Sequence, residues 1–196
     1  MKEVVLASAS ERRSRILSDC GIPHRVLPSG AEERMDGDRE VSETVRMNAE
    51  MKAETVASGE EQAVVIGADT LVVHGNEIIG KPHGEGAARK MLGDFSGGKV
   101  EVYTGLCVID AASGKKAVGF EKSSLIVSKL SDDEIKRYFR LLGPYDKAGG
   151  FSIEGIGSLI FDDIRGSYFN ILGLPMLKLK GLFEEIGLDI LDFVKV

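Results

Sequence analysis

The segment that most constrains the fold is the apolar run Ala63 to Val73, AVVIGADTLVV. Apolar and β-branched residues dominate the run, at odd and at even positions. Both faces of an extended strand would therefore be apolar. A strand of this kind needs covering layers on each face of its sheet. The run therefore predicts a central, buried strand in an α/β protein.

Two polar residues, Asp69 and Thr70, lie inside this run. Aspartate is depleted in strands, and an unpaired carboxylate is costly to bury. A buried Asp69 therefore needs a metal ion, a cationic partner or a catalytic task. The alternative is a structural carboxylate that accepts hydrogen bonds from neighbouring backbone. We favour the functional interpretation.

A second constraint is the segment Leu6 to Leu17, LASASERRSRIL, in which a strand passes through small residues into a helix. Ser10 is the expected N-cap. Arg12 and Arg13 lie in the first turn, where the partial positive charge of the helix disfavours cations. Backbone N–H groups, the hydroxyls of Ser8 and Ser10 and two guanidinium groups would together suit a phosphate chain. The alternative is that both arginines are solvated.

Three further charged residues stand out. A helix is predicted over 43–57, and Lys52 lies on its apolar stripe, seven residues after Val45. Its ammonium group must therefore either extend past the apolar side chains to the surface or meet a buried anion. Glu33 stands in an acidic loop, 31–38, whose other carboxylates are expected to be solvated. Lys81 stands in a rigid Gly-Lys-Pro corner, from which it can project toward a phosphate.

The rest of the pattern predicts alternating strands and helices. Strands are expected at 24–27, 77–79, 100–110 and 116–128, and helices at 87–95, 131–142 and 174–186. The glycine-rich segment 145–175 predicts strands at 151–153, 158–161 and 168–172, and an edge strand is expected at 190–196. We expect one domain, residues 1–196.

Composition excludes several classes of protein. The net charge of −6 argues against a general nucleic-acid-binding surface. Cys20 and Cys107 are far apart, and the three histidines are scattered, so zinc is not expected and the cysteines are expected to be reduced and buried. The sequence shows no signal peptide and no apolar run long enough to span a membrane, so a cytoplasmic protein is expected.

The charged candidates fit one chemistry. The cations are Arg12, Arg13, Lys52 and Lys81, and the carboxylates are Glu33 and Asp69. Phosphoryl transfer from a nucleotide needs cations to stabilise phosphate oxygens, and carboxylates to hold Mg²⁺ or Mn²⁺ and to activate water. No serine or cysteine has an evident histidine partner, so a covalent nucleophile is not expected.

The sequence also resembles a known family, the Maf (septum-formation protein) family of nucleoside triphosphate pyrophosphatases. The resemblance runs from Leu6 to the final helix. It is carried by an ordered set of motifs: S-x-S-x-R-R at Ser8–Arg13, G-A-D-T at Gly67–Thr70, G-K-P at Gly80–Pro82, T-G at Thr104–Gly105, D-K-A-G at Asp146–Gly149, I-x-G at Ile153–Gly155 and G-L-P at Gly173–Pro175.

The resemblance implies a fold similar to that of inosine triphosphate pyrophosphatases, which is a long twisted mixed sheet with flanking helices and two lobes around a central cleft. It implies cleavage of a nucleoside triphosphate between the α and β phosphates, giving the monophosphate and pyrophosphate, with Mg²⁺ or Mn²⁺ as cofactor. The partner is then the nucleotide, with no nucleic acid or membrane involved. A homodimer and a link to cell-division arrest are left open.

The resemblance also assigns roles to residues. It implies that Asp69 is the proton acceptor and that Glu33 and Asp69 are the acidic metal positions. It places substrate choice on Arg12, Thr70 and Glu154. It places the remaining substrate contacts on Ser8, Arg13, Lys52 and Lys81.

The D-K-A-G motif and the Gly-Phe-Ser-Ile that follows it most resemble the branch that hydrolyses dTTP and UTP, and modified pyrimidine nucleotides are included in that expectation. Glu154 stands where the family often has glutamine. An ionised glutamate can only accept hydrogen bonds, so the base is left open. The alternatives are a 7-methyl-GTP-type pyrophosphatase and a nucleotide-binding regulator of cell division with little catalysis.

Overall fold

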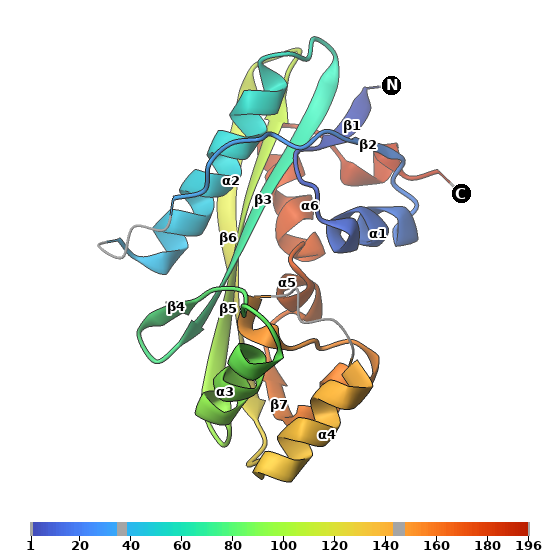
Figure 1. Ribbon diagram of the computed structural model, residues 1–196. Coiled ribbons are helices and arrows are strands. Elements are labelled where there is room, and N and C mark those ends of the chain that lie inside the picture. Colours follow the sequence, from blue (N-terminus) through green and yellow to red (C-terminus); the bar gives the residue numbers. More distant parts are fainter. Residues whose placement is uncertain (1, 35–38, 143–147, 196) are drawn as a thin grey trace. The chain divides into compact units, whose positions relative to one another are not determined.

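The computed structural model of the chain describes residues 2–34, 39–142 and 148–195. These residues form a seven-stranded sheet in the order β2-β1-β3-β5-β6-β7, with β4 also paired to β3 (Figure 1). The strands are β1 (Glu3–Leu6), β2 (His24–Val26), β3 (Ala63–His74), β4 (Glu77–Ile79), β5 (Lys99–Asp110), β6 (Lys115–Val127) and β7 (Phe161–Arg165). The helices are α1 (Glu11–Asp19), α2 (Val41–Ala57), α3 (Glu85–Phe95), α4 (Asp132–Leu142), α5 (Tyr168–Leu172) and α6 (Met176–Glu185).

The sheet is mixed, as expected. β1 runs parallel to both β2 and β3, whereas β4 is antiparallel to β3 and β7 is antiparallel to β6. β3 lies between β1 and β5, and Val64, Val65 and Ile66 are completely buried. The prediction of a central, buried strand is therefore confirmed.

Contacts divide the chain into two compact units, which are described separately. Unit 1 consists of Met1–Thr70, Tyr103–Glu121 and Phe169–Val196. Unit 2 consists of Leu71–Val102 and Lys122–Tyr168. β3, β5 and β6 each contribute residues to both units.

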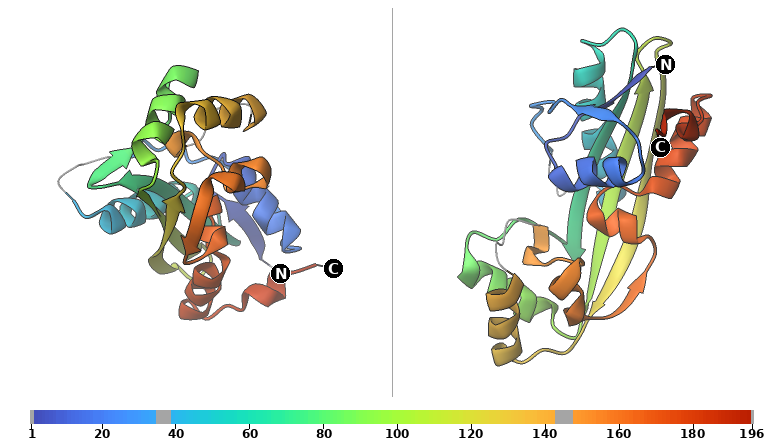
Figure 2. Two further views of the ribbon diagram at one scale, coloured as in Figure 1. Left: turned by 90° about the horizontal axis from the view of Figure 1, so that it is seen from below. Right: turned by 90° about the vertical axis from the view of Figure 1, so that its right-hand side faces the viewer.

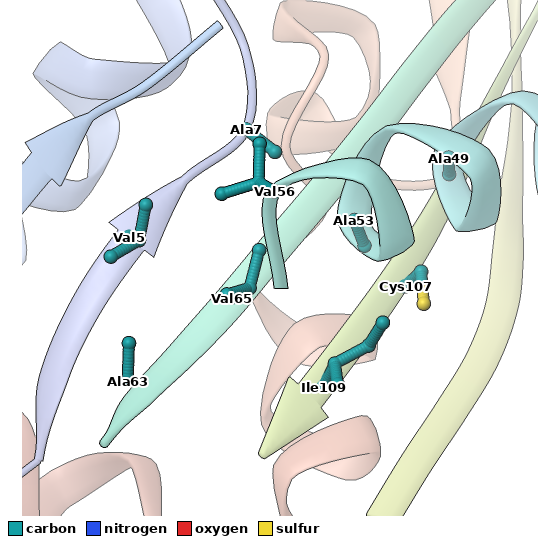
Figure 3. Packing of buried hydrophobic residues seen from close by; sticks show 9 residues of the cluster. All are labelled: Val5, Ala7, Ala49, Ala53, Val56, Ala63, Val65, Cys107 and Ile109. Atoms are coloured by element: carbon teal, nitrogen blue, oxygen red, sulfur yellow. The ribbon is translucent and has the colours of Figure 1, made fainter. Parts of the chain in front are cut away.

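In unit 1, α2 lies very close to the sheet. Small side chains of α2, Ala49 and Ala53, pack on residues of β1, β3 and β5 (Figure 3). A Cβ atom added at Gly67 of β3 would lie 2.1 Å from the Ala49 carbonyl oxygen, and one at Gly105 of β5 would lie 2.1 Å from that of Val45. Because real Cβ contacts are never this short, glycine at both positions is what lets the helix backbone approach the strands.

Helix α6 packs against the opposite face of the unit 1 strands from α2 (Figure 2). Leu179 and Leu182 of α6 are buried, and a Cβ atom at Gly119 of β6 would meet Leu182 at 3.3 Å. The strands of unit 1 are therefore covered on both faces, which is what their apolar composition requires.

Unit 2 is held by an aromatic cluster. Phe95 of α3 packs edge-on against Phe151, and Phe151 packs edge-on against Phe161 of β7. α4 begins with a capping box, in which the Ser131 backbone N–H donates to the Glu134 carboxylate at 2.8 Å. None of the helices in the described ranges is long and apolar enough to cross a membrane.

The strand prediction for the glycine-rich segment is largely wrong. β7 begins at Phe161, and the preceding residues form 3₁₀ helices at Ala148–Gly150 and Gly155–Ile160. Gly149, Gly150 and Gly155 have φ values of 73°, 67° and 56°. These left-handed conformations cannot continue a strand, so the glycines turn the chain instead.

Two other strand predictions are wrong. Residues Tyr168–Leu172 form helix α5, and Ile190–Phe193 form a 3₁₀ helix. The latter starts where the Asp189 side chain accepts a hydrogen bond from the Leu191 backbone N–H at 2.9 Å. Local side-chain capping of this kind competes with strand pairing.

The cysteines are both free thiols, as expected, but only one of them is fully buried. Cys107 lies in the core of unit 1, and burial raises the pKa of its thiol to about 12. Cys20 follows α1 and is half-buried.

Candidate active site

Asp69 lies in the buried centre of β3 and is held by two side chains of α2. Lys52 Nζ donates to Asp69 Oδ1 at 2.8 Å, and Asn48 Nδ2 donates to Asp69 Oδ2 at 2.9 Å. The Asp69 side chain is only 5% exposed. A buried Asp69 was expected to need a metal ion, a cationic partner or a catalytic task. The structure provides the cationic partner, which is Lys52.

Helical spacing explains why Asn48 and Lys52 meet the same carboxylate. They are four residues apart, so they lie one above the other on the face of α2 that also carries Ala49 and Ala53. The close approach of α2 at Gly67 brings this face within reach of β3. Lys52 therefore meets a buried anion and does not extend to the surface.

Lys52 also links Asp69 to Glu33. Its Nζ donates to Glu33 Oε1 at 2.6 Å, and the Glu33 side chain is 46% exposed. One ammonium group thus lies between a buried carboxylate and a half-exposed one. The negative charge of Asp69 is compensated on the inner side, while Glu33 remains accessible to solvent.

Arg13 is buried and occupied by protein oxygens. Nε donates to the Gly173 carbonyl at 2.7 Å, Nη1 to Ser8 Oγ at 2.8 Å and the Ala68 carbonyl at 3.1 Å, and Nη2 to Thr70 Oγ1 at 2.8 Å. These contacts use four of the five N–H groups of a guanidinium. Burial lowers the pKa of Arg13, an effect that Asp69 and Glu33 oppose.

The Thr70 hydroxyl has a fixed hydrogen-bond direction. Thr104 Oγ1 donates its only hydrogen to the Asn170 carbonyl at 3.1 Å, so the 3.0 Å contact between the two threonine hydroxyls must be donated by Thr70. Thr70 Oγ1 also accepts from Arg13. One lone pair remains, and a ligand can therefore reach Thr70 Oγ1 only as a donor.

Ser8 has the opposite polarity. Its Oγ accepts from the Ser10 backbone N–H at 3.3 Å and from Arg13 Nη1 at 2.8 Å, which uses both lone pairs. Among the described residues nothing accepts the Ser8 hydroxyl hydrogen. Ser8 can therefore act as a donor, which suits a phosphate oxygen.

The two groups of contacts meet at one carbonyl. The Ala68 oxygen accepts from Arg13 Nη1 at 3.1 Å and from Lys52 Nζ at 3.4 Å. We call the residues joined in this way the Asp69 cluster: Ser8, Arg13, Glu33, Asn48, Lys52, Asp69 and Thr70. Two positive and two negative side chains within it balance. Arg12 is half-buried beside the cluster, and its side chain makes no hydrogen bond or ion pair with any other described residue.

The two neighbouring arginines should respond differently to replacement by lysine. R13K should lower the free energy of unfolding by about 2–4 kcal/mol, because an ammonium cannot reproduce the planar set of contacts and leaves buried oxygens unpaired. R12K should change it by less than about 0.5 kcal/mol. Urea denaturation measures both. Equal, small losses would contradict the structural role assigned to Arg13.

Two of the predicted residues belong to unit 2. Lys81 is exposed after β4, and Glu154 is half-buried between the two 3₁₀ helices, where its backbone N–H donates to Ser152 Oγ at 3.2 Å. Their grouping with the Asp69 cluster stays a prediction. Asp146 and Lys147 of the D-K-A-G motif lie outside the described residues, as do positions 35–38 of the acidic loop.

The acidic residues can hold a metal ion only if a phosphate ligand and water supply the rest of its coordination shell. Within the described ranges there is no group of three or more His, Cys, Asp or Glu residues that could hold a metal. Glu33 and Asp69 offer two carboxylates that already share Lys52. Mg²⁺ is commonly held by one or two carboxylates while substrate phosphates and water complete its shell. This donor set therefore fits Mg²⁺ or Mn²⁺ bound together with phosphates.

Asn48 and Thr104 are site residues that the sequence reasoning missed. Asn48 could have been noticed, because it is a polar residue on the same buried stripe as Lys52 and four positions before it. Thr104 was part of a quoted motif, but no sequence pattern places it against Thr70.

One serine has a histidine partner in the structure, although no such partner was evident in the sequence. Ser14 Oγ lies 2.8 Å from His24 Nε2. His24 Nδ1 faces the Ile22 carbonyl at 2.9 Å, so Nδ1 carries the hydrogen and Nε2 of the neutral ring accepts from Ser14. The contact links α1 to β2, and the sequence offered no periodic signal for it.

Taken together, these features define an α/β protein with a buried, charge-balanced cluster in the central strand of a mixed sheet. The family model described as Maf-like protein matches residues 3–186. The chain belongs to this family.

Several curated relatives match over nearly the whole chain. A dTTP/UTP pyrophosphatase of Desulforamulus reducens is 39% identical, covering 97% of this chain and 100% of its own. Another of Caldicellulosiruptor bescii is 39% identical over 97% of this chain and 98% of its own. A third, of Alkaliphilus oremlandii, is 41% identical over 91% and 93%. Among solved structures, a HAM1 protein from Coxiella burnetii aligns with 82% of this chain and 81% of its own at 12% identity, with a TM-score of 0.47.

Proposed function

We propose that the chain is a nucleoside triphosphate pyrophosphatase that hydrolyses dTTP and UTP to the monophosphate and pyrophosphate. The observation that carries the proposal is the buried Asp69 carboxylate held between Lys52 and Asn48, in a chain 39% identical over 97% of its length to a dTTP/UTP pyrophosphatase. Residues 1–196 would form one catalytic domain, and a homodimer remains a prediction.

Asp69 is suited to take a proton from water. Each carboxylate oxygen accepts one hydrogen bond from the protein, so each keeps a lone pair for a water molecule. Lys52 Nζ lies 2.8 Å from Asp69 Oδ1, so its ammonium group holds the carboxylate in place as a general base requires. In the proposed reaction, water oxygen bonds to the α-phosphorus, its proton passes to Asp69, and the α–β bridging bond breaks so that pyrophosphate leaves.

Glu33 and Asp69 would hold a Mg²⁺ or Mn²⁺ ion that arrives with the triphosphate. The ion would supply charge neutralisation for the phosphate oxygens. Ser8 would donate to a phosphate oxygen, and Arg12 and Lys81, which have no hydrogen-bond or ion-pair partner among the described residues, are candidates for the remaining charge. Arg13 would act mainly by holding Ser8 and Thr70, because four of its N–H groups are occupied.

The hydrogen-bond polarity of the predicted specificity residues suits an imide. Thymine and uracil present one N–H donor between two carbonyl acceptors. Thr70 Oγ1 can only accept from a ligand, and an ionised Glu154 carboxylate can only accept. Arg12 can only donate. Acceptors for the imide N–H and a donor for a carbonyl are therefore both present among these residues.

A substrate panel tests the proposal. The protein is incubated with dTTP, UTP, CTP, GTP or 7-methyl-GTP in the presence of Mg²⁺ or Mn²⁺, and pyrophosphate release is measured. We expect dTTP and UTP to be the preferred substrates. Preference for 7-methyl-GTP would assign the chain to the other branch, whereas tight binding without pyrophosphate release would favour the regulator of cell division.

A further inference from the structure

We propose that Asn48 is a positioning residue that holds both carboxylates of the proposed catalytic site at the ammonium group of Lys52. Asn48 is only 1% exposed. Its amide contacts Asp69 directly and contacts the backbone of Arg34, which is the neighbour of Glu33 in the chain. The inference rests on the proposed function, because it assigns a role in that reaction.

The backbone partners determine the orientation of the Asn48 amide. The Arg34 backbone N–H donates to Asn48 Oδ1 at 2.9 Å, so an oxygen must lie there. Asn48 Nδ2 donates to the Arg34 carbonyl at 2.9 Å, so a nitrogen must lie on the other side. The second hydrogen of Nδ2 is then directed at Asp69 Oδ2, at 2.9 Å. All hydrogens of the amide are used, and reversing it would break all three bonds.

The same three bonds tie an exposed loop to a buried strand. Glu33 and Arg34 are exposed and lie outside any helix or strand. Asn48 pairs with both peptide groups of Arg34 as a neighbouring strand would, and this contact places Glu33 where Lys52 Nζ reaches it at 2.6 Å. Asn48 therefore sets the position of Glu33 through the backbone and the position of Asp69 through its carboxylate.

Loss of Asn48 should change the chemical step more than substrate binding. In N48A the ion pair between Lys52 and Asp69 remains, but Asp69 Oδ2 loses its donor and the Glu33 loop loses its anchor. Removing the partner that orients a functional group typically costs 10–100-fold, so we expect kcat to fall by roughly that factor. KM should rise by a smaller factor than kcat falls, because Asn48 contacts no substrate itself and acts on the bound triphosphate only through Glu33.

The experiment compares N48A and N48D with T44V as the matched control. Thr44 is one turn earlier on α2 and 2% exposed, and among the described residues its hydroxyl donates only to the carbonyl of Glu40, the N-cap of α2. T44V should leave kcat within about threefold of the original. N48D preserves volume but loses both amide hydrogens and adds a negative charge beside Asp69, so it should lose more activity than N48A. Should N48A fail to fold, N48D carries the same test.

Hydrogen exchange gives a readout that does not depend on turnover. Exchange of the backbone amides in 29–34 should accelerate in N48A and stay unchanged in T44V. A double-mutant cycle adds a separate test that is measured as activity: E33Q should cost much less activity in the N48A background than in the original protein, because Glu33 is no longer held at Lys52.

The outcomes separate the inference from the proposed function. Unchanged kcat in N48A, an equal fall in T44V, or additive effects of E33Q and N48A would overturn the role of Asn48 while leaving the pyrophosphatase assignment intact. If the original protein releases no pyrophosphate from any triphosphate, the proposed function fails. Hydrogen exchange of the backbone amides in 29–34 then still decides whether Asn48 anchors the loop. An unchanged exchange rate in N48A would overturn the anchoring role too.

Discussion

Replacement of Asp69 by asparagine is expected to lower kcat for pyrophosphate release by about 10²–10⁴-fold, the range over which general bases contribute. The amide has no proton-accepting charge, although its shape is that of the carboxylate. One of its ends must also present N–H groups to a donor, either Lys52 Nζ or Asn48 Nδ2. A loss of about 1–3 kcal/mol in stability should accompany the change, while the fold is retained.

Asp110 provides a matched control for this substitution. It is a buried carboxylate at the end of β5, held by Lys2 and by Ser113, and no role in the reaction is assigned to it. D110N should cost stability but keep kcat. Thermal unfolding and circular dichroism establish that both variants are folded. Full turnover in D69N would remove Asp69 from the reaction and with it the proposed mechanism.

The second large effect concerns stability. K52M should lower the free energy of unfolding by about 3–5 kcal/mol, because it leaves the carboxylate of Asp69 buried without its cation. The side chains of Lys52 and Asp69 are 9% and 5% exposed, so water cannot replace the lost partner without rearrangement. Urea denaturation at neutral pH measures the change.

The control is a lysine with a similar contact pattern on the surface. Lys116 also bridges two carboxylates, Glu50 and Glu54 of α2, but its side chain is 36% exposed. K116M should cost less than about 1 kcal/mol, since solvent screens exposed pairs. If K116M proved as destabilising as K52M, burial would not be the reason for the effect, and the account of the Asp69 cluster would need revision.

The elements with a strong local signal were predictable. The apolar run of β3 indicated its central place, and the serine before the arginines indicated the start of α1: Ser10 Oγ accepts from the Arg13 backbone N–H at 3.5 Å. The stripe of α2 placed Lys52 on the inner face. In each case the signal lies within one element, where side-chain spacing alone decides which residues share a face.

The glycine-rich segment shows where such reasoning fails. Its apolar residues suggested strands, but Gly149, Gly150 and Gly155 adopt left-handed conformations that turn the backbone. Glycine permits these conformations without requiring them. Whether a glycine bends the chain depends on what the neighbouring residues pack against, and no local pattern carries that information.

The residue pattern predicted an aspartate inside a buried central strand, put Lys52 on the apolar stripe of its helix, and carried the resemblance to one family of enzymes. It left open whether Lys52 reaches the surface or an anion, and it did not identify the partners of these residues; the folded chain answers both questions. Asn48 meets Asp69, Thr104 orients Thr70, and Arg13 contacts β3 at Ala68 and Thr70 as well as the distant Gly173. The physical reason is distance along the chain, because these contacts join residues 21 to 160 positions apart, and close packing of α2 and the strands brings them within hydrogen-bond reach.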